Sequence, residues 1–83
     1  MIVKVFSIHD VKASTFGQPF FAVNKGIAVR MFADLVGDKQ SMVSKHPDDF
    51  KLYLLGDFDD NSGGLSPLAQ PEFLHSASEF VNS

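Results

Sequence analysis

Three phenylalanines in a segment that contains glycine and proline are the residues of this chain best suited to bind a flat ligand. Phe16, Phe20 and Phe21 lie in the stretch FGQPFF (16–21), whose Gly and Pro disfavour an ordinary helix. Cations precede and follow this stretch, and aromatic rings interleaved with cations are typical of a surface on which single-stranded nucleic acid bases stack. The candidate cations are Lys4, Lys12, Lys25 and Arg30.

The same rings also have a purely structural interpretation. A small domain with nine phenylalanines can use rings from a connecting segment to cover its core, and composition alone favours that role slightly. However, Phe20 and Phe21 are adjacent, and adjacent side chains of an extended segment point to opposite sides. We therefore expect at most one of these two rings to be buried, so that the other is free for stacking.

The remaining chemistry-bearing residues form no pattern for catalysis or metal binding. An EF-hand loop that began at Asp57 would need Gly at its sixth position and Glu at its twelfth, where the chain has Ser62 and Leu68. The histidines are far apart, without metal-ligand spacing, at His9, His46 and His75. The chain also lacks a Gly-x-Ser-x-Gly nucleophile motif and a phosphate-binding glycine loop. We expect no enzyme, no catalytic residues, no metal and no cofactor.

Length and composition indicate a single domain over residues 1–83. Of its 83 residues 45% are hydrophobic, which is enough for one small core and argues against disorder. The absence of cysteine excludes disulfides and thiolate metal sites. We find neither an apolar run of membrane-spanning length nor a signal-peptide pattern, so we expect an intracellular protein that does not bind a membrane.

Charge is distributed unevenly along the chain, although the net charge is only −3. Residues 1–51 hold all seven basic residues and five acidic ones, a balance of +2. Residues 52–83 hold five acidic residues and neither Lys nor Arg, a balance of −5. The local field decides where a polyanion docks, so we expect a nucleic acid to meet the N-terminal half.

Hydrophobic periodicity predicts an α+β domain with a small, mainly antiparallel sheet packed against one helix. Residues 1–8 alternate as a strand, and residues 50–68 read as a hairpin that turns at 59–64. In its first strand, Leu52, Leu54 and Phe58 share one face, and Lys51, Tyr53 and Leu55 share the other. The helix is predicted over 25–36, with Asn24 as its N-cap, after a long connection over 9–23.

The C-terminal segment has a different pattern from the hairpin that precedes it. From Pro71 onward apolar residues recur at helical spacing, so we expect residues 69–83 to form a tail that docks on the sheet or on a second subunit. Three strands and one helix are too few to cover both faces of a sheet. A homodimer is therefore expected.

Five segments follow one another along most of the chain in a recognisable order: SIHDVKA (7–13), FGQPFF (16–21), AVRMF (28–32), KHPDDF (45–50) and LYLLGDFDD (52–60). In these segments the chain resembles the small nonstructural protein of gokushovirus-type microviruses. These bacteriophages have circular single-stranded DNA genomes, and the resemblance implies a single-stranded DNA-binding protein associated with viral DNA replication. It supplies no catalytic residues.

The residues and the resemblance lead to one main hypothesis. We expect a phage protein of the host cytoplasm that binds single-stranded DNA during genome replication or its switch to packaging. The rings Phe16, Phe20 and Phe21 would stack on bases, and the four cations Lys4, Lys12, Lys25 and Arg30 would meet phosphates. The alternative is a module that engages a host or viral protein through the acidic hairpin and the C-terminal tail.

Overall fold

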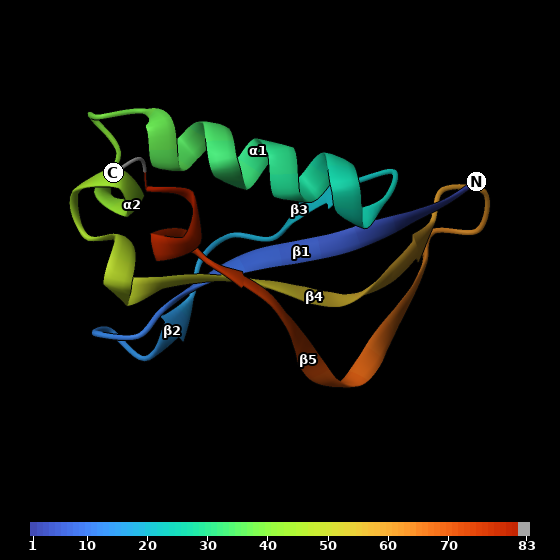
Figure 1. The fold of residues 1–83 in the computed structure, drawn as a ribbon. Helices are drawn as coiled ribbons and strands as arrows, with labels where there is room; N and C mark the ends of the chain where they lie inside the picture. Colours follow the sequence, from blue (N-terminus) through green and yellow to red (C-terminus); the bar gives the residue numbers. More distant parts are fainter. Residues whose placement is uncertain (82–83) are drawn as a thin grey trace.

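A single antiparallel sheet with one covered face forms the framework of the protein. The computed structural model describes residues 1–81. The strands follow the order β2-β1-β4-β5, and β3 also pairs with β1. Helix α1 (Lys25–Gly37) lies over one face, and no helix of the described chain lies over the opposite face (Figure 1). The strands are β1 (Ile2–Asp10), β2 (Thr15–Phe16), β3 (Phe20–Ala22), β4 (Phe50–Asp59) and β5 (Gly64–Ser76). The α+β prediction is confirmed.

The core lies between α1 and the inner strands. Phe6 of β1 and Leu52 and Leu54 of β4 are buried, because alternate residues of the two paired strands point to the same side. The helix contributes its i, i+4 stripe, Ala28, Phe32 and Val36. Burial of these apolar side chains, at about 25 cal/mol per Å² of apolar area removed from water, is the main stabilising term of the domain.

Helix α1 begins where the sequence predicts. The Asn24 side chain accepts a hydrogen bond from the Ile27 backbone N–H at 2.9 Å, as an N-cap does. The helix ends at Gly37, one residue later than predicted, with Asp38 as C-cap. The short helix α2 (Met42–Lys45) and the 3₁₀ turn η1 (Pro47–Asp49) then lead into β4. No helix among residues 1–81 has both the length and the apolarity needed to cross a bilayer.

The segment predicted as a long connection forms an edge of the sheet instead. Strands β2 and β3 pair one after the other with β1, and residues 17–19 interrupt them. Two hydrogen bonds fasten the interruption: Ser7 Oγ donates to the Gly17 carbonyl at 2.7 Å, and the Gly17 N–H donates to the Ile8 carbonyl at 2.8 Å. Pro19 has no N–H to add to the ladder, which suits a break at an edge.

Residues 69–80, predicted as a tail that docks on the sheet or on a second subunit, continue the hairpin beyond its expected end at residue 68. Strand β5 runs to Ser76 and pairs with β4, and the 3₁₀ turn η2 (Ala77–Phe80) follows with Ala77 fully buried. Backbone pairing thus overrides the helical spacing of the apolar residues. Residues 82–83 of the predicted tail lie outside the described residues.

Strand β5 is sharply bent at its middle (Figure 1). Its register moves from Gly56 opposite Pro67 to Leu54 opposite Glu72, so residues 68–71 bulge out of the ladder. At Gly56 the strands approach so closely that a Cβ would lie 2.4 Å from the Ser66 carbonyl oxygen and 2.8 Å from Pro67 Cα. Glycine is therefore required at this position.

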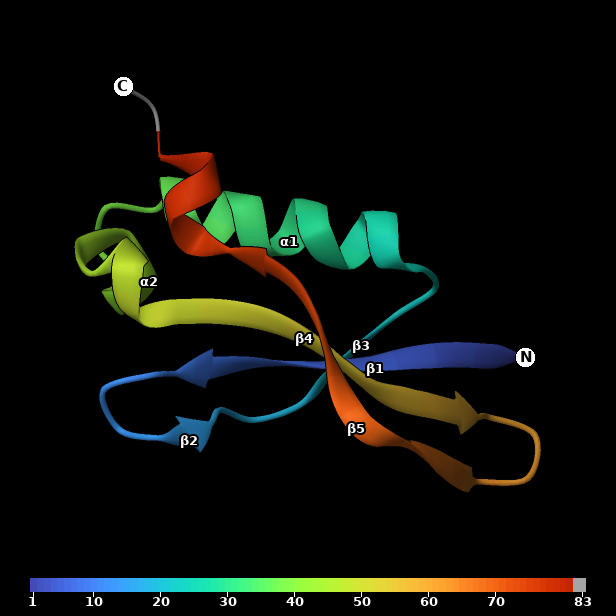
Figure 2. The ribbon, with the colours of Figure 1, turned by 60° about the horizontal axis from the view of Figure 1, so that its bottom comes forward.

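The hairpin between β4 and β5 turns as predicted and extends past the helix. Gly63 has φ of 76°, a left-handed conformation that glycine adopts at little cost. The turn and the N-terminus project together beyond the first turn of α1 (Figures 1 and 2). They are joined by an ion pair of 2.6 Å between the Met1 ammonium and Asp60.

Candidate nucleic-acid interface

The register of the strands decides which side chains face away from α1. In β1 these are the odd-numbered residues, from Val3 to His9. Residues opposite one another in an antiparallel pair share a face, so their partners in the other strands face the same way. We call this uncovered side of the sheet the open face.

Aromatic rings cross the open face in a row that involves four strands. The aromatic row consists of Phe16 (β2), His9 (β1), Tyr53 (β4) and Phe73 (β5). Ring centroids lie 4.5 Å apart for His9 and Phe16, 5.3 Å for Phe16 and Tyr53, and 5.8 Å for Tyr53 and Phe73. At the end of the row, Lys51 Nζ lies 5.9 Å from the centre of the Phe73 ring. The rings of these three pairs meet at 52°, 73° and 69°, so the row is a run of tilted and edge-to-face aromatic contacts with a cation beside it.

A second aromatic pair lies toward the hairpin end of the same face. The rings of Phe21 and Phe58 are 5.4 Å apart, in an edge-to-face arrangement. Next to this pair is an apolar groove of about 220 Å³, lined by Val5, Leu55, Gly56, Leu65 and Pro67. The open face thus carries two aromatic regions joined along β1.

Carboxylates of the strands are absent from the open face. The acidic residues of the described strands are Asp10, Asp57, Asp59 and Glu72, and their register places each of them on the side of α1. On that side Asp57 accepts a hydrogen bond from Lys4 Nζ at 3.0 Å. The strand residues of the open face therefore bear only basic titratable side chains and Tyr53, which suits a polyanion despite the negative net charge of the chain.

The family of the chain follows from its similarity to known proteins. The phage ORF5 protein family matches residues 3–80, which is nearly the whole sequence. The chain belongs to this family. Protein ORF5 of Chlamydia phage 1 is 33% identical over 67 residues, which cover 76% of this chain and 70% of the relative. No solved structure matches the chain. It is a small phage protein of the microvirus type, as the resemblance predicted.

The predicted aromatic residues of this phage protein divide between the two faces. Phe16 and Phe21 lie on the open face, with 42% and 50% of their surface exposed. Phe20 packs against the core, its ring 5.7 Å from that of Phe6. Phe20 is partly buried and Phe21 is exposed, in agreement with the prediction that at most one of the two rings lies in the core. Phe20 is not placed to stack on a base, because its ring already lies against Phe6.

The predicted cations are not brought together with the exposed rings. Lys4 and Lys25 both form ion pairs on the side of α1, Lys4 with Asp57 and Lys25 with Glu72 at 2.9 Å. Arg30 is exposed on α1 itself, across the sheet from the aromatic row. Only Lys12 lies near the row, in the turn between β1 and β2. Lys4 faces α1 because side chains alternate along β1, and Lys25 and Arg30 belong to the helix that covers that face.

The sequence analysis did not identify five residues of the open face as candidates for nucleic-acid binding. They are His9, Lys51, Tyr53, Phe58 and Phe73. The predicted alternation of side chains along β4 correctly placed Lys51 and Tyr53 on the face away from the core. This alternation was the signal in the sequence that could have identified them. Phe58 was assigned to the wrong face, because a bulge at Leu55 shifts the register of β4.

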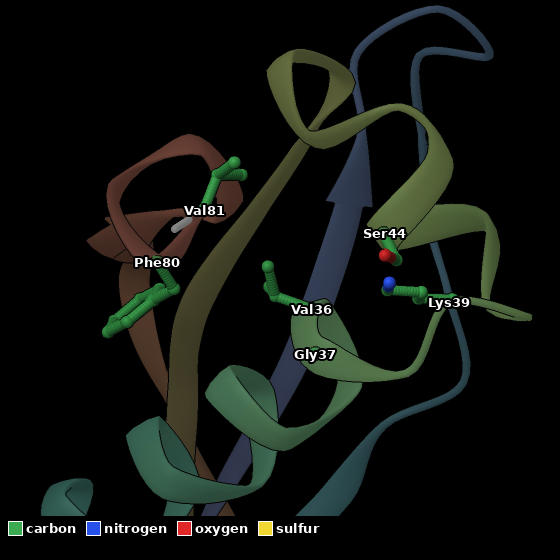
Figure 3. Close-up of a pocket in the computed structure, with 6 residues that line it drawn as sticks. All are labelled: Val36, Gly37, Lys39, Ser44, Phe80 and Val81. Carbon is green, nitrogen blue, oxygen red and sulfur yellow. The ribbon is translucent and has the colours of Figure 1, made fainter. Parts of the chain in front are cut away.

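Another cavity, of about 360 Å³, lies away from the open face, at the C-terminal end of α1 (Figure 3). Its lining residues are Val36, Gly37, Lys39, Ser44, Phe80 and Val81. The side chains of Lys39 and Ser44 point toward each other on one side of it. Within residues 1–81, no three His, Asp or Glu residues are grouped so as to hold a metal ion. The open face remains the surface with the most distinctive chemistry.

Proposed function

We propose that this phage protein binds single-stranded DNA through its open face. The observation that carries the proposal is the aromatic row, whose rings contact one another across four strands, with Phe16 and Phe73 42% and 49% exposed, on a side of the sheet without strand carboxylates. Every base has a π face, so such a surface accepts unpaired bases of any sequence. Paired bases in a duplex are already stacked on each other and do not offer their faces.

The expected affinity is moderate. Stacking on an aromatic side chain contributes about 1–3 kcal/mol per base. Phe16, Tyr53 and Phe73 each provide one ring for such stacking. A dissociation constant of 1 µM corresponds to about 8 kcal/mol, which two or three stacked bases and a few phosphate contacts can reach. We expect Lys51, beside the Phe73 ring, and Lys12, in the turn after β1, to supply those contacts, so the dependence on salt is expected to be shallow.

The proposed step is genome replication or its switch to packaging. Support comes from the microvirus-type family, since the resemblance implies a phage with a single-stranded DNA genome. The alternative role, a protein-interaction module, has less support. Residues 69–80, which this alternative uses as its C-terminal tail, are part of the sheet and core, and the hairpin carboxylates of Asp57 and Asp60 are ion-paired.

Fluorescence anisotropy tests the proposal with a labelled thymidine oligonucleotide of about 12 units, a length within the usual site sizes. The variant Phe16→Ala should bind about tenfold more weakly than the wild type, because one stacking ring is lost. Met31→Ala is the matched control, an apolar residue 44% exposed on α1, and it should bind as the wild type does. Absence of binding by the wild type at millimolar protein, or equal losses in both variants, would reject the proposal.

A further inference from the structure

We infer that the apolar groove beside Phe21 and Phe58 seats a pyrimidine and contacts the methyl group of thymine. The protein then distinguishes thymine from uracil, and it does not distinguish deoxyribose from ribose. This inference rests on the proposed function and deepens it, because it names the base that the open face prefers.

The size of the groove suits one six-membered ring. Its volume is about 220 Å³, and a cavity of about 150 Å³ in another protein is sufficient for benzene. Val5 of β1 lies on one side of Gly56, Leu65 and Pro67 of β5 lie on the other, and Leu55 precedes Gly56 in β4. A pyrimidine base therefore fits.

The shape of the groove is fixed by the backbone. Gly56 lets β5 approach β4 at Ser66 and Pro67, where a Cβ would collide with backbone atoms. The wall formed by Leu65 and Pro67 is thus held by strand pairing and by the rigid proline ring. A groove that is formed in advance loses little entropy when a ligand enters.

The aromatic pair lies directly beside the groove. In the register of the sheet Phe21 is opposite Val5, and Phe58 is opposite Leu65. A base in the groove would therefore meet an aromatic ring as well as aliphatic side chains. Leu65 is 65% exposed, so the base would remove apolar surface from water there.

The lining residues favour apolar contact with a methyl group and offer no side-chain hydrogen bond to the sugar. None of the five lining residues has a side-chain N–H or O–H group. Recognition of a ribose 2′-hydroxyl requires a hydrogen-bonding partner, whereas the thymine methyl is read by apolar contact. One buried methyl-sized group is worth about a fourfold difference in affinity.

The groove and the aromatic row can be occupied by one strand at the same time. Val5 and His9 are four residues apart on β1, a separation of about 14 Å. A strand of several nucleotides spans that length. The absence of strand carboxylates extends over both regions, so the same charge complementarity applies to the groove.

Three labelled oligonucleotides of about 12 units test the inference, one built of thymidine, one of deoxyuridine and one of uridine. We expect the thymidine strand to bind about fourfold more tightly than the deoxyuridine strand, which differs only in the methyl group. The deoxyuridine and uridine strands should bind equally within twofold. Equal binding of the thymidine and deoxyuridine strands, or a larger difference between the two uracil strands, would overturn the inference and leave the proposed function intact. Failure of all three strands to bind would reject both.

Two variants separate the groove from the row. Leu65→Ala should abolish the preference for thymidine over deoxyuridine, and its high exposure means that the fold is kept, which circular dichroism can check. Phe73→Ala should weaken the binding of all three oligonucleotides equally and keep the fourfold ratio of affinity between thymidine and deoxyuridine. A ratio that persists in Leu65→Ala would contradict the inference.

Discussion

The two faces of the sheet use the same residue type for different purposes. On the side of α1, Phe6 and Phe32 are almost completely buried, with exposed fractions of 0% and 1%. On the open face Phe73 keeps 49% of its surface exposed, like Phe16 and Phe21. Carboxylates of the strands follow the opposite rule, since all of them lie on the side of α1. The comparison shows that strand register, more than composition, divides core from candidate ligand surface.

The largest expected effect is on the stability of the protein when a ring is removed from one face or from the other. Phe32→Ala should lower the free energy of unfolding by about 3–5 kcal/mol, because it removes a fully buried ring from the core. Phe16→Ala should lower it by only about 1 kcal/mol, since its ring is partly exposed and contacts only neighbours on the surface. Urea denaturation measures both values. Similar losses for the two variants would break the distinction between the faces.

A pair of glycine variants tests the close approach that forms the groove. Gly56→Ala should destabilise the protein by about 1–3 kcal/mol, because its Cβ would meet backbone atoms of β5. Gly37→Ala, with nothing within 4 Å of its added Cβ, should be neutral or stabilising by up to about 1 kcal/mol. Thermal unfolding of both variants gives the comparison. A neutral Gly56→Ala variant would mean that β5 is not held against β4 there.

A smaller effect should separate the cations of the two faces. When the logarithm of the affinity for single-stranded DNA is plotted against the logarithm of the salt concentration, Lys51→Ala should make the slope less steep by about 0.7. This is the change expected for one lost phosphate contact. Lys25→Ala should leave the slope unchanged, because Lys25 pairs with Glu72 on the other face. Titrations at several salt concentrations give the slopes. Equal changes in both variants would show that phosphates also contact the side of α1.

The smallest expected effect concerns η2. Hydrogen bonds from His75 and from the Ser76 N–H lower the pKa of Glu79 below its ordinary value of 4.5. A lowered folded-state pKa gives stability that is present above pH 4.5 and is lost as the pH falls below it. Glu79→Gln should therefore lose less stability than the wild type between neutral and acidic pH, as thermal unfolding can measure. Parallel profiles would contradict this role of the carboxylate.

Local signals in the sequence predicted much of the fold. The alternation in β1 and β4, the turn at 59–64 and the Asn24 cap are each determined by residues near one another in the chain. The separation of Phe20 from Phe21 also followed from the geometry of an extended segment. The homodimer and the role in DNA binding stay predictions.

The composition of the open face could not be predicted in the same way. The bulge at Leu55 shifted Phe58 to the open face, because one extra residue reverses the alternation of side chains beyond it, and the predicted alternation ran through Leu55 without this reversal. Phe73 reached the aromatic row because backbone pairing extended β5, against the helical spacing of its apolar residues. Lys4 and Lys25 lie on the side of α1, where each pairs with a carboxylate more than 45 positions away in the sequence.

Nuclear magnetic resonance mapping tests most directly whether the open face is the binding surface. A thymidine oligonucleotide titrated into the isotope-labelled wild-type protein should shift the backbone amide signals of His9, Phe16, Tyr53 and Phe73. The amides along α1, including those of Lys25 and Arg30, should stay in place. Shifts concentrated on α1 with none on the aromatic row would contradict the central claim.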